Sequence, residues 1–140
     1  MSRVKHTTKE VELLARLMKS EALGEGKFGM MLVGNAGVNR VVAHCGLHRR
    51  ATSIQQMVFQ DPGGFEGANT PLFNQPVTKM HKDLAKKTLV FWRAHPAFRA
   101  LYFRNPGAGQ PCGPEFFGPL SGRFKNHCYY NPAPEEECGI

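Results

Sequence analysis

The stretch 7–42, TTKEVELLARLMKSEALGEGKFGMMLVGNAGVNRVV, decides the fold, because it holds two apolar segments separated by a pair of glycines. Thr7 and Glu10 have the spacing of a capping box, in which side chains at a helix start satisfy free backbone donors. The apolar residues that follow at helical spacing are Val11, Leu14, Ala15, Met18 and Ala22. We therefore predict an amphipathic helix that ends at about Leu23, where the glycines favour a helix terminus.

The second segment runs from Phe28 to about Val42 and is again rich in apolar residues. Its glycines are Gly29, Gly34 and Gly37. They lower the helix propensity, but a glycine also lets another backbone come close. We interpret this segment as a buried helix.

Two further helices are expected along the chain. Ser53 and Gln56 suggest a capping box that opens a short helix. A loop rich in Gly, Pro, Asn and Thr follows over residues 61–76. A longer helix is then expected over about Thr78–Leu89.

The last third of the chain has a different pattern. Residues 98–103 and 127–130 are short, aromatic and typical of strands, with a long Gly- and Pro-rich connection between them that we expect to be irregular. The ends, 1–9 and 133–140, are expected to be flexible parts of one domain that spans 1–140. The predicted fold class is α+β, mainly helical with a small antiparallel sheet toward the C-terminus.

Length and composition also indicate a single globular domain. The chain has 140 residues, of which 41% are hydrophobic and 21% charged. No apolar run of about 18 residues suggests a membrane span, and no signal peptide is apparent, so we expect synthesis in the cytoplasm. The 18 basic and 11 acidic residues give a net charge of +7, which attracts polyanions such as nucleic acid or cell-wall polymer, or serves solubility.

The cysteines carry no recognisable metal or redox motif. They are Cys45, Cys112, Cys128 and Cys138. No C-x-x-C pair exists, which argues against a zinc ribbon or a thioredoxin-type site. Reduced thiols are the expectation without a leader, and the sequence leaves any pairing open. His44, Cys45 and His48 form an isolated H-C-x-x-H cluster, which is more often incidental than a metal site, so we predict none.

The string 20–26, SEALGEG, holds the strongest candidate for catalysis. On a helical wheel Glu21 lies beside Leu14 and Met18, at the edge of the apolar face. A carboxyl group against apolar neighbours has a raised pKa, as a general acid needs near neutral pH. The alternative is an exposed Glu21 at a fraying helix end. Glu25 is the competing acid, and periodicity nominates both without choosing between them.

Basic and aromatic residues alternate between Lys86 and Arg104. This pattern suits nucleic-acid binding, a groove in which sugars stack, or plain core packing. A Gly24-x-Gly26-x-x-Gly29 string is also present, but it follows a helix instead of a strand, so it gives little support to dinucleotide binding.

Several blocks of the chain have counterparts, in the same order, in one known family. The blocks are LLARL at 13–17, SEALGEG at 20–26, VGNAGVNR at 33–40, IQQMVFQ at 54–60, Phe65-Glu66, ALYF at 100–103 and FKNHCYYNP at 124–132. Together they resemble the SleB/CwlJ family of spore cortex-lytic cell-wall hydrolases, most closely its CwlJ-type branch, over about Leu13–Pro132.

The resemblance implies a lysozyme-like α+β domain that cleaves spore cortex peptidoglycan during germination. In that family the first glutamate of the E-A-x-G-E string is the proposed catalytic acid, which is Glu21 in this chain. Glu25 then becomes a supporting residue that holds the loop or a substrate hydroxyl. Leu23 departs from the family pattern, where an arginine is frequent, so a role for charge at this position is in doubt.

A single acid can cleave a glycoside if the substrate supplies the nucleophile, although ordinary glycosidases use two carboxyl groups. Glu21 would protonate the glycosidic oxygen and then accept a proton from the muramic C6 hydroxyl or from water. The sequence leaves open which bond is cut and which nucleophile attacks. Tyr102, Tyr129 and Asn131 are candidate substrate contacts, with core packing the equal alternative for the aromatics, and Tyr130 faces the other side of its strand.

The resemblance extends to partners and location. It implies no resident cofactor, activation by calcium dipicolinate, a spore-coat protein partner, and a place at the boundary between spore coat and cortex. Peptidoglycan is the expected substrate, with no nucleic acid bound. The alternative class is a non-catalytic cell-wall-binding domain or a basic nucleic-acid-binding domain.

Overall fold

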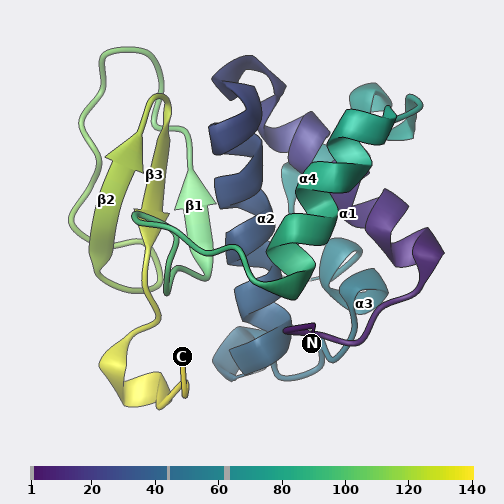
Figure 1. The fold of residues 1–140 in the computed structure, drawn as a ribbon. Coiled ribbons are helices and arrows are strands. Elements are labelled where there is room, and N and C mark those ends of the chain that lie inside the picture. The colour runs from purple at the N-terminus through teal and green to yellow at the C-terminus, as the bar shows by residue number, and fades with distance from the viewer. Residues whose placement is uncertain (1, 44, 62–63) are drawn as a thin grey trace.

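A computed structural model describes residues 2–43, 45–61 and 64–140. The main helices are α1 (Thr8–Ala22), α2 (Gly26–Ala43), α3 (Ile54–Val58) and α4 (Lys79–Val90), and the strands are β1 (Tyr102–Arg104), β2 (Leu120–Phe124) and β3 (His127–Tyr130). In Figure 1, α2 stands between the sheet on one side and α1 and α4 on the other. The predicted α+β class, mainly helical with a small antiparallel sheet, is confirmed.

The opening helix forms as predicted. The Thr7 side chain accepts from the Glu10 N–H, and the Glu10 carboxylate accepts from the Thr7 N–H, so the capping box is complete. α1 ends at Ala22, and a single 3-10 turn, Leu23–Glu25, joins it to α2. Gly26 has a φ of 79°, a conformation that a residue with a side chain rarely adopts, so the glycine fixes where α2 begins.

Helix α2 is the buried centre of the molecule. Its residues from Gly29 to Val41 are all buried, which agrees with the interpretation of this segment as a core helix. A Cβ at Gly34 would press on Met18 of α1 and Thr88 of α4, so this glycine allows both helices to pack closely. The sequence suggested that these glycines let another backbone come close, but the groups that approach Gly34 are side chains.

Polar side chains on α2 fasten the segment that leads into the sheet. The Asn39 amide donates to the carbonyls of Ala97, Phe98 and Ala100, at 2.9–3.2 Å. The Arg40 Nε donates to the Leu101 carbonyl at 2.7 Å. Because buried donors and acceptors must be paired, these bonds set the position of β1 against the helical half.

The shorter helices also agree with the sequence. Ser53 caps α3 by accepting from the Gln56 N–H, although the Gln56 side chain reaches the Thr52 N–H and not that of Ser53. Thr78 caps α4, one residue before its first turn. None of the helices in the described ranges combines the length and apolar character that a bilayer-spanning segment needs.

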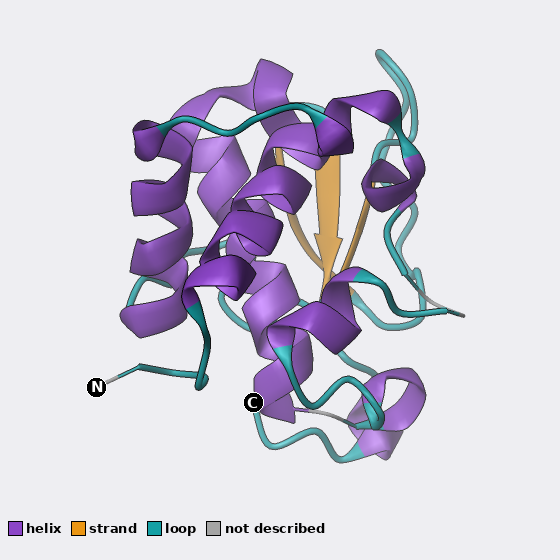
Figure 2. Cartoon of the chain, turned by 90° about the vertical axis from the view of Figure 1, so that its right-hand side faces the viewer, coloured by secondary structure: helices purple, strands orange, loops and turns teal. Residues whose placement is uncertain are grey.

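The sheet has three antiparallel strands in the order β1-β3-β2. β3 matches its predicted bounds, while β1 begins only at Tyr102, because residues 94–101 form turns held by α2. β2 lies inside the connection that was expected to be irregular, so that expectation is wrong there. Figure 2 shows the strands behind the helices.

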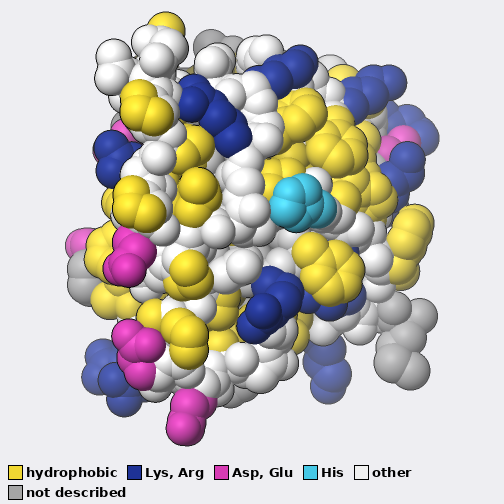
Figure 3. All heavy atoms as spheres, turned by 90° about the vertical axis from the view of Figure 1, so that its left-hand side faces the viewer, with side chains coloured by type: hydrophobic (Ala, Val, Ile, Leu, Met, Phe, Trp, Pro, Cys, Tyr) yellow, Lys and Arg dark blue, Asp and Glu magenta, His cyan; other side chains and the backbone are white. Residues whose placement is uncertain are grey.

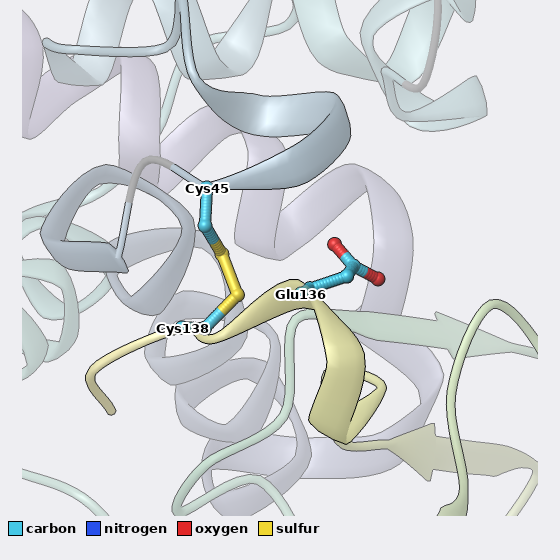
Figure 4. Close-up of side chains that lie close together, drawn as sticks. All are labelled: Cys45, Glu136 and Cys138. Atoms are coloured by element: carbon cyan, nitrogen blue, oxygen red, sulfur yellow. A yellow bond between two sulfur atoms is a disulfide. The ribbon is translucent and has the colours of Figure 1, made fainter.

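Two disulfide bonds correct the expectation of reduced thiols. Cys45 pairs with Cys138, and Cys112 pairs with Cys128, with Cα–Cα distances of 5.6 and 5.8 Å. The first bond ties the C-terminal tail to the region just after α2, with Glu136 beside it (Figure 4). Of the H-C-x-x-H cluster, Cys45 is bonded to sulfur and His44 lies outside the described residues, so Cys45 has no thiolate to offer a metal.

The disulfides predict a dependence of stability on redox state. Replacing Cys112 and Cys128 by serine opens a loop of 16 residues, which we expect to lower the free energy of unfolding by about 3 kcal/mol. Denaturant unfolding with and without reductant measures the loss. An unfolding midpoint that reductant does not change would contradict the two pairings.

Candidate active site

A cleft of about 600 Å³ opens where the end of α1, the turn Glu66–Asn69, β1 and the loop before β2 come together. Its wall carries the chemically useful side chains Glu21, Glu66, Arg40, Tyr102, Phe103 and His127. Segments far apart in the sequence therefore supply one site. A cleft with polar and ionisable side chains in its wall is the usual arrangement for a ligand or substrate site.

Glu21 lies in the last turn of α1, half-buried in this wall. Its carboxylate accepts a hydrogen bond from the backbone N–H of Gly67. Burial raises the pKa of Glu21, and the charge of Glu66 raises it further. The Gly67 bond and the charges of His127 and Arg40 act in the opposite direction, but the net pKa remains raised. The structure thus places the predicted acid as the sequence suggested, against low-dielectric surroundings and facing a cleft.

Arg40 supplies a buried positive charge beside Glu21. Its guanidinium carbon lies 4.0 Å from the centre of the Phe65 ring. Burial lowers the pKa of Arg40 to about 9, against the charges of Tyr102 and Glu21, which raise it. Arg40 is therefore still a cation at neutral pH and can stabilise the carboxylate that Glu21 becomes after giving up its proton.

Glu25 occupies a different place from Glu21. It is 5% exposed and is not part of the cleft wall. Its carboxylate accepts from the Asn126 N–H at 2.7 Å and lies 2.6 Å from the His127 Nδ1, while its carbonyl accepts from the Lys125 Nζ at 3.2 Å. Of the two supporting roles considered for Glu25, this geometry matches holding a loop, here the β2–β3 turn, and not contact with substrate.

Of the three other candidate substrate contacts, one lies in the cleft wall and two lie outside it. Tyr102 lines the cleft. Tyr129 and Asn131 do not, because Tyr129 is fully buried against α2 and Asn131 follows the end of β3. Tyr130 is fully buried as well, since β3 is the central strand and is covered on both faces.

Three side chains of the cleft wall were not nominated by the sequence. Glu66 and His127 reach the cleft only through the folding of the chain, and no local spacing marked them. Arg40 did leave a signal, because a charged residue within the last turn of a buried apolar helix requires a partner. That signal could have been taken as a sign of a buried ion site.

The close fit between Glu21 and Gly67 makes a testable prediction. A Cβ at Gly67 would collide with the Glu21 carboxylate and the Ser20 hydroxyl. We expect Gly67→Ala to displace Glu21 and to lower activity by about 100-fold, as misplacement of a catalytic group does. Kinetics on solubilised cell-wall glycan measure the loss.

Gly24→Ala is the matched control, because a Cβ at Gly24 meets nothing within 4 Å. It should keep full activity. Equal activity of the two variants would contradict the placement of Glu21 against Gly67.

Comparisons with known proteins identify the family of this chain. The family described as Cell Wall Hydrolase matches residues 24–130, a segment that begins just after Glu21. Cell wall hydrolase CwlJ of Oceanobacillus iheyensis is 43% identical over 133 residues, which cover 94% of this chain and 93% of the relative. The CwlJ of Bacillus subtilis is 39% identical over 137 residues, covering 96% and 94% of the two chains.

The fold has a counterpart among solved structures. The catalytic domain of the Bacillus cereus SleB protein superposes with a TM-score of 0.71 over 92% of this chain and 96% of that domain, at 18% identity. This structural likeness shows that the two proteins share a fold, whereas the sequence matches show the family to which the chain belongs. The chain belongs to the Cell Wall Hydrolase family.

Proposed function

We propose that this protein cleaves glycosidic bonds of spore cortex peptidoglycan during germination, with Glu21 as its general acid. The observation that carries the proposal is the half-buried Glu21 carboxyl, whose pKa is raised, in the wall of the cleft. The names of the curated relatives support cell-wall glycan as the substrate.

The first step of the proposed reaction is a proton transfer from Glu21 to the substrate. Glu21 donates its proton to the glycosidic oxygen as the bond from C1 to that oxygen breaks, and the positive charge that develops on the sugar faces the new carboxylate. The same carboxylate then accepts the proton of the nucleophile, which is either water or the muramic C6 hydroxyl. The second choice closes a 1,6-anhydro ring, and neither choice requires a cofactor.

The cleft walls suit a glycan chain. Aromatic rings from two segments border it, Tyr102 and Phe103 from β1 and Phe116 and Phe117 from the loop before β2. Such rings pack against the apolar faces of sugars. Arg104, which is exposed and lies 5.3 Å from the Phe116 ring, offers a cation for the carboxylates that peptidoglycan carries.

The alternative of nucleic-acid binding is not favoured. The Glu66 carboxylate lies in the cleft wall, where it would repel phosphate groups. On the face shown in Figure 3, Lys and Arg side chains are scattered among hydrophobic ones and do not form a continuous stripe.

We extend the proposal to location and regulation. Two disulfides support a final location outside a reducing compartment, which agrees with the boundary between spore coat and cortex. A coat-protein partner and activation by calcium dipicolinate follow from the family resemblance alone.

Loss of the acid tests the proposed function. Glu21→Gln keeps the size of the side chain but cannot donate a proton in the same way, so we expect activity to fall by a factor of about 10²–10⁴. Clearing of decoated spores gives the rate, and mass spectrometry of the released muropeptides identifies the bond cut and shows whether a 1,6-anhydro end forms.

Glu135→Gln, in the exposed tail, is the control that should behave as wild type. A fully active Glu21→Gln variant, or a wild-type protein that releases no muropeptides, would overturn the proposal.

The charge of Glu66 predicts a shift in the pH profile. Glu21 must be protonated to act, so activity falls as the pH rises through its pKa. Glu66 raises that pKa, so Glu66→Gln should lower it and move the alkaline limb of the profile to lower pH. The shift should shrink in high salt, because Glu66 is exposed. An alkaline limb that stays in place or moves upward would contradict this electrostatic coupling.

A further inference from the structure

His127, which lines the cleft, is paired with a buried carboxylate behind the cleft wall, that of Glu25. The Glu25 Oε1 lies 2.6 Å from the His127 Nδ1, and the two side chains come from residues 102 positions apart in the sequence. Glu25 is 5% exposed and His127 is 7% exposed. A contact this short between buried groups is a strong, charge-assisted hydrogen bond.

Every other contact of the pair holds it in one orientation. The second oxygen of Glu25 accepts from the Asn126 N–H. The His127 ring packs edge-on against Phe103, with 5.4 Å between ring centres, and Phe103 in turn stacks on Phe65. The imidazole is therefore fixed from two sides.

The bond determines which ring nitrogen faces the cleft. A carboxylate has no proton to donate, so Nδ1 carries the proton and, in the neutral ring, Nε2 carries a lone pair. Within the described residues Nε2 makes no hydrogen bond and is not a buried atom without a partner. His127 lines the cleft, so this nitrogen is accessible from it.

His127 also lies within electrostatic range of Glu21. When its imidazole is protonated, the charge of His127 lowers the pKa of the Glu21 carboxyl. The cleft wall thus brings a proton donor, Glu21, near an oriented proton acceptor. Glu21 need not then serve both steps of the reaction.

We propose that His127 is a second catalytic residue, the base that takes the proton of the nucleophile, and that Glu25 is the positioning residue that sets its tautomer. This inference deepens the proposed function and rests on it. Under this proposal Glu25 affects catalysis through His127, although Glu25 does not line the cleft.

The proton transfers balance. The Glu21 proton moves to the glycosidic oxygen as the bond from C1 to that oxygen breaks. The nucleophile oxygen, from water or the C6 hydroxyl, bonds to C1, and its proton moves to the His127 Nε2. The imidazolium that forms is stabilised by Glu25, and its proton returns to the Glu21 carboxylate, directly or by exchange through solvent, which completes the cycle.

Glu66 is the competing base, since its carboxylate lies in the same wall and acts on Glu21. It is exposed, and no hydrogen bond from any residue in the described ranges orients its side chain. A base that is not oriented must reach the reactive geometry anew in each catalytic cycle. Glu66 is therefore a weaker candidate for the base than His127, which is held in place.

Two conservative variants test the proposal. In Glu25→Gln the amide can still accept from the Asn126 N–H, but its NH₂ faces Nδ1, so the proton moves to Nε2 and the lone pair is lost from the cleft side. His127→Asn removes the base. We expect both variants to lose about 100-fold or more in turnover while remaining folded at the assay temperature, which denaturant unfolding checks. The double variant should be no worse than His127→Asn, because Glu25 acts only through His127.

Matched controls are His95→Asn and Glu135→Gln, which remove exposed side chains outside the cleft and should leave turnover unchanged. Added imidazole should restore part of the turnover of His127→Ala but none of that of Glu21→Gln. A merely structural His127 would not respond to imidazole.

Each outcome decides between the two proposals. If Glu21→Gln is inactive but Glu25→Gln and His127→Asn turn over within a few fold of wild type, the inference fails while the proposed function stands. If Glu66→Gln alone reproduces the loss, Glu66 is the base and the inference fails. If the wild-type protein releases no muropeptides, both fail. Should His127→Ala prove unfolded, the folding and turnover of Glu25→Gln decide the matter.

Discussion

The structure depends on the enclosure of α2, a helix that is buried on every side from Gly29 to Val41. An enclosed helix must pair its few polar side chains internally. Asn39 therefore binds three carbonyls of the segment 97–100, and Arg40 binds the next one, that of Leu101. These bonds attach β1 to the helical half, and β1 with the loop before β2 forms one wall of the cleft. The opposite wall is the end of α1, which packs on the same helix. The position of the cleft follows from α2.

The junction between α1 and α2 gives two acids, four residues apart, different environments. Glu21 belongs to the last turn of α1 and faces the cleft, where burial raises its pKa. Glu25 belongs to the 3-10 turn that follows, and the positive φ of Gly26 directs the chain into α2. The Glu25 side chain is thereby buried against β3 and not placed beside Glu21. The string E-A-x-G-E thus places one acid in the cleft wall and the other against a histidine of that wall.

Much of the fold could be predicted because its signals are local. The capping residues Thr7 and Ser53, the apolar spacing of α1 and the aromatic pattern of β3 lie within single elements. β2 could not be predicted, since Leu120–Phe124 contains a glycine and has exposed positions, and it forms only by pairing with β3. The site shows the same division. Helical periodicity nominated Glu21 together with Glu25, and the family resemblance favoured Glu21, whereas Glu66 and His127 reach the cleft through contacts between distant segments. Tyr129 was misjudged because strand alternation does not show that a central strand is covered on both faces.

The central claim is that Glu21 holds a proton in the cleft at a pH where an ordinary glutamate has lost it. A titration of the Glu21 carboxyl carbon by NMR, with selectively labelled protein and with Glu21→Gln to assign the signal, measures this directly. The account predicts a midpoint above the ordinary value of 4.5, and a lower midpoint in Glu66→Gln. A midpoint at or below 4.5 in the folded wild-type protein would contradict the account.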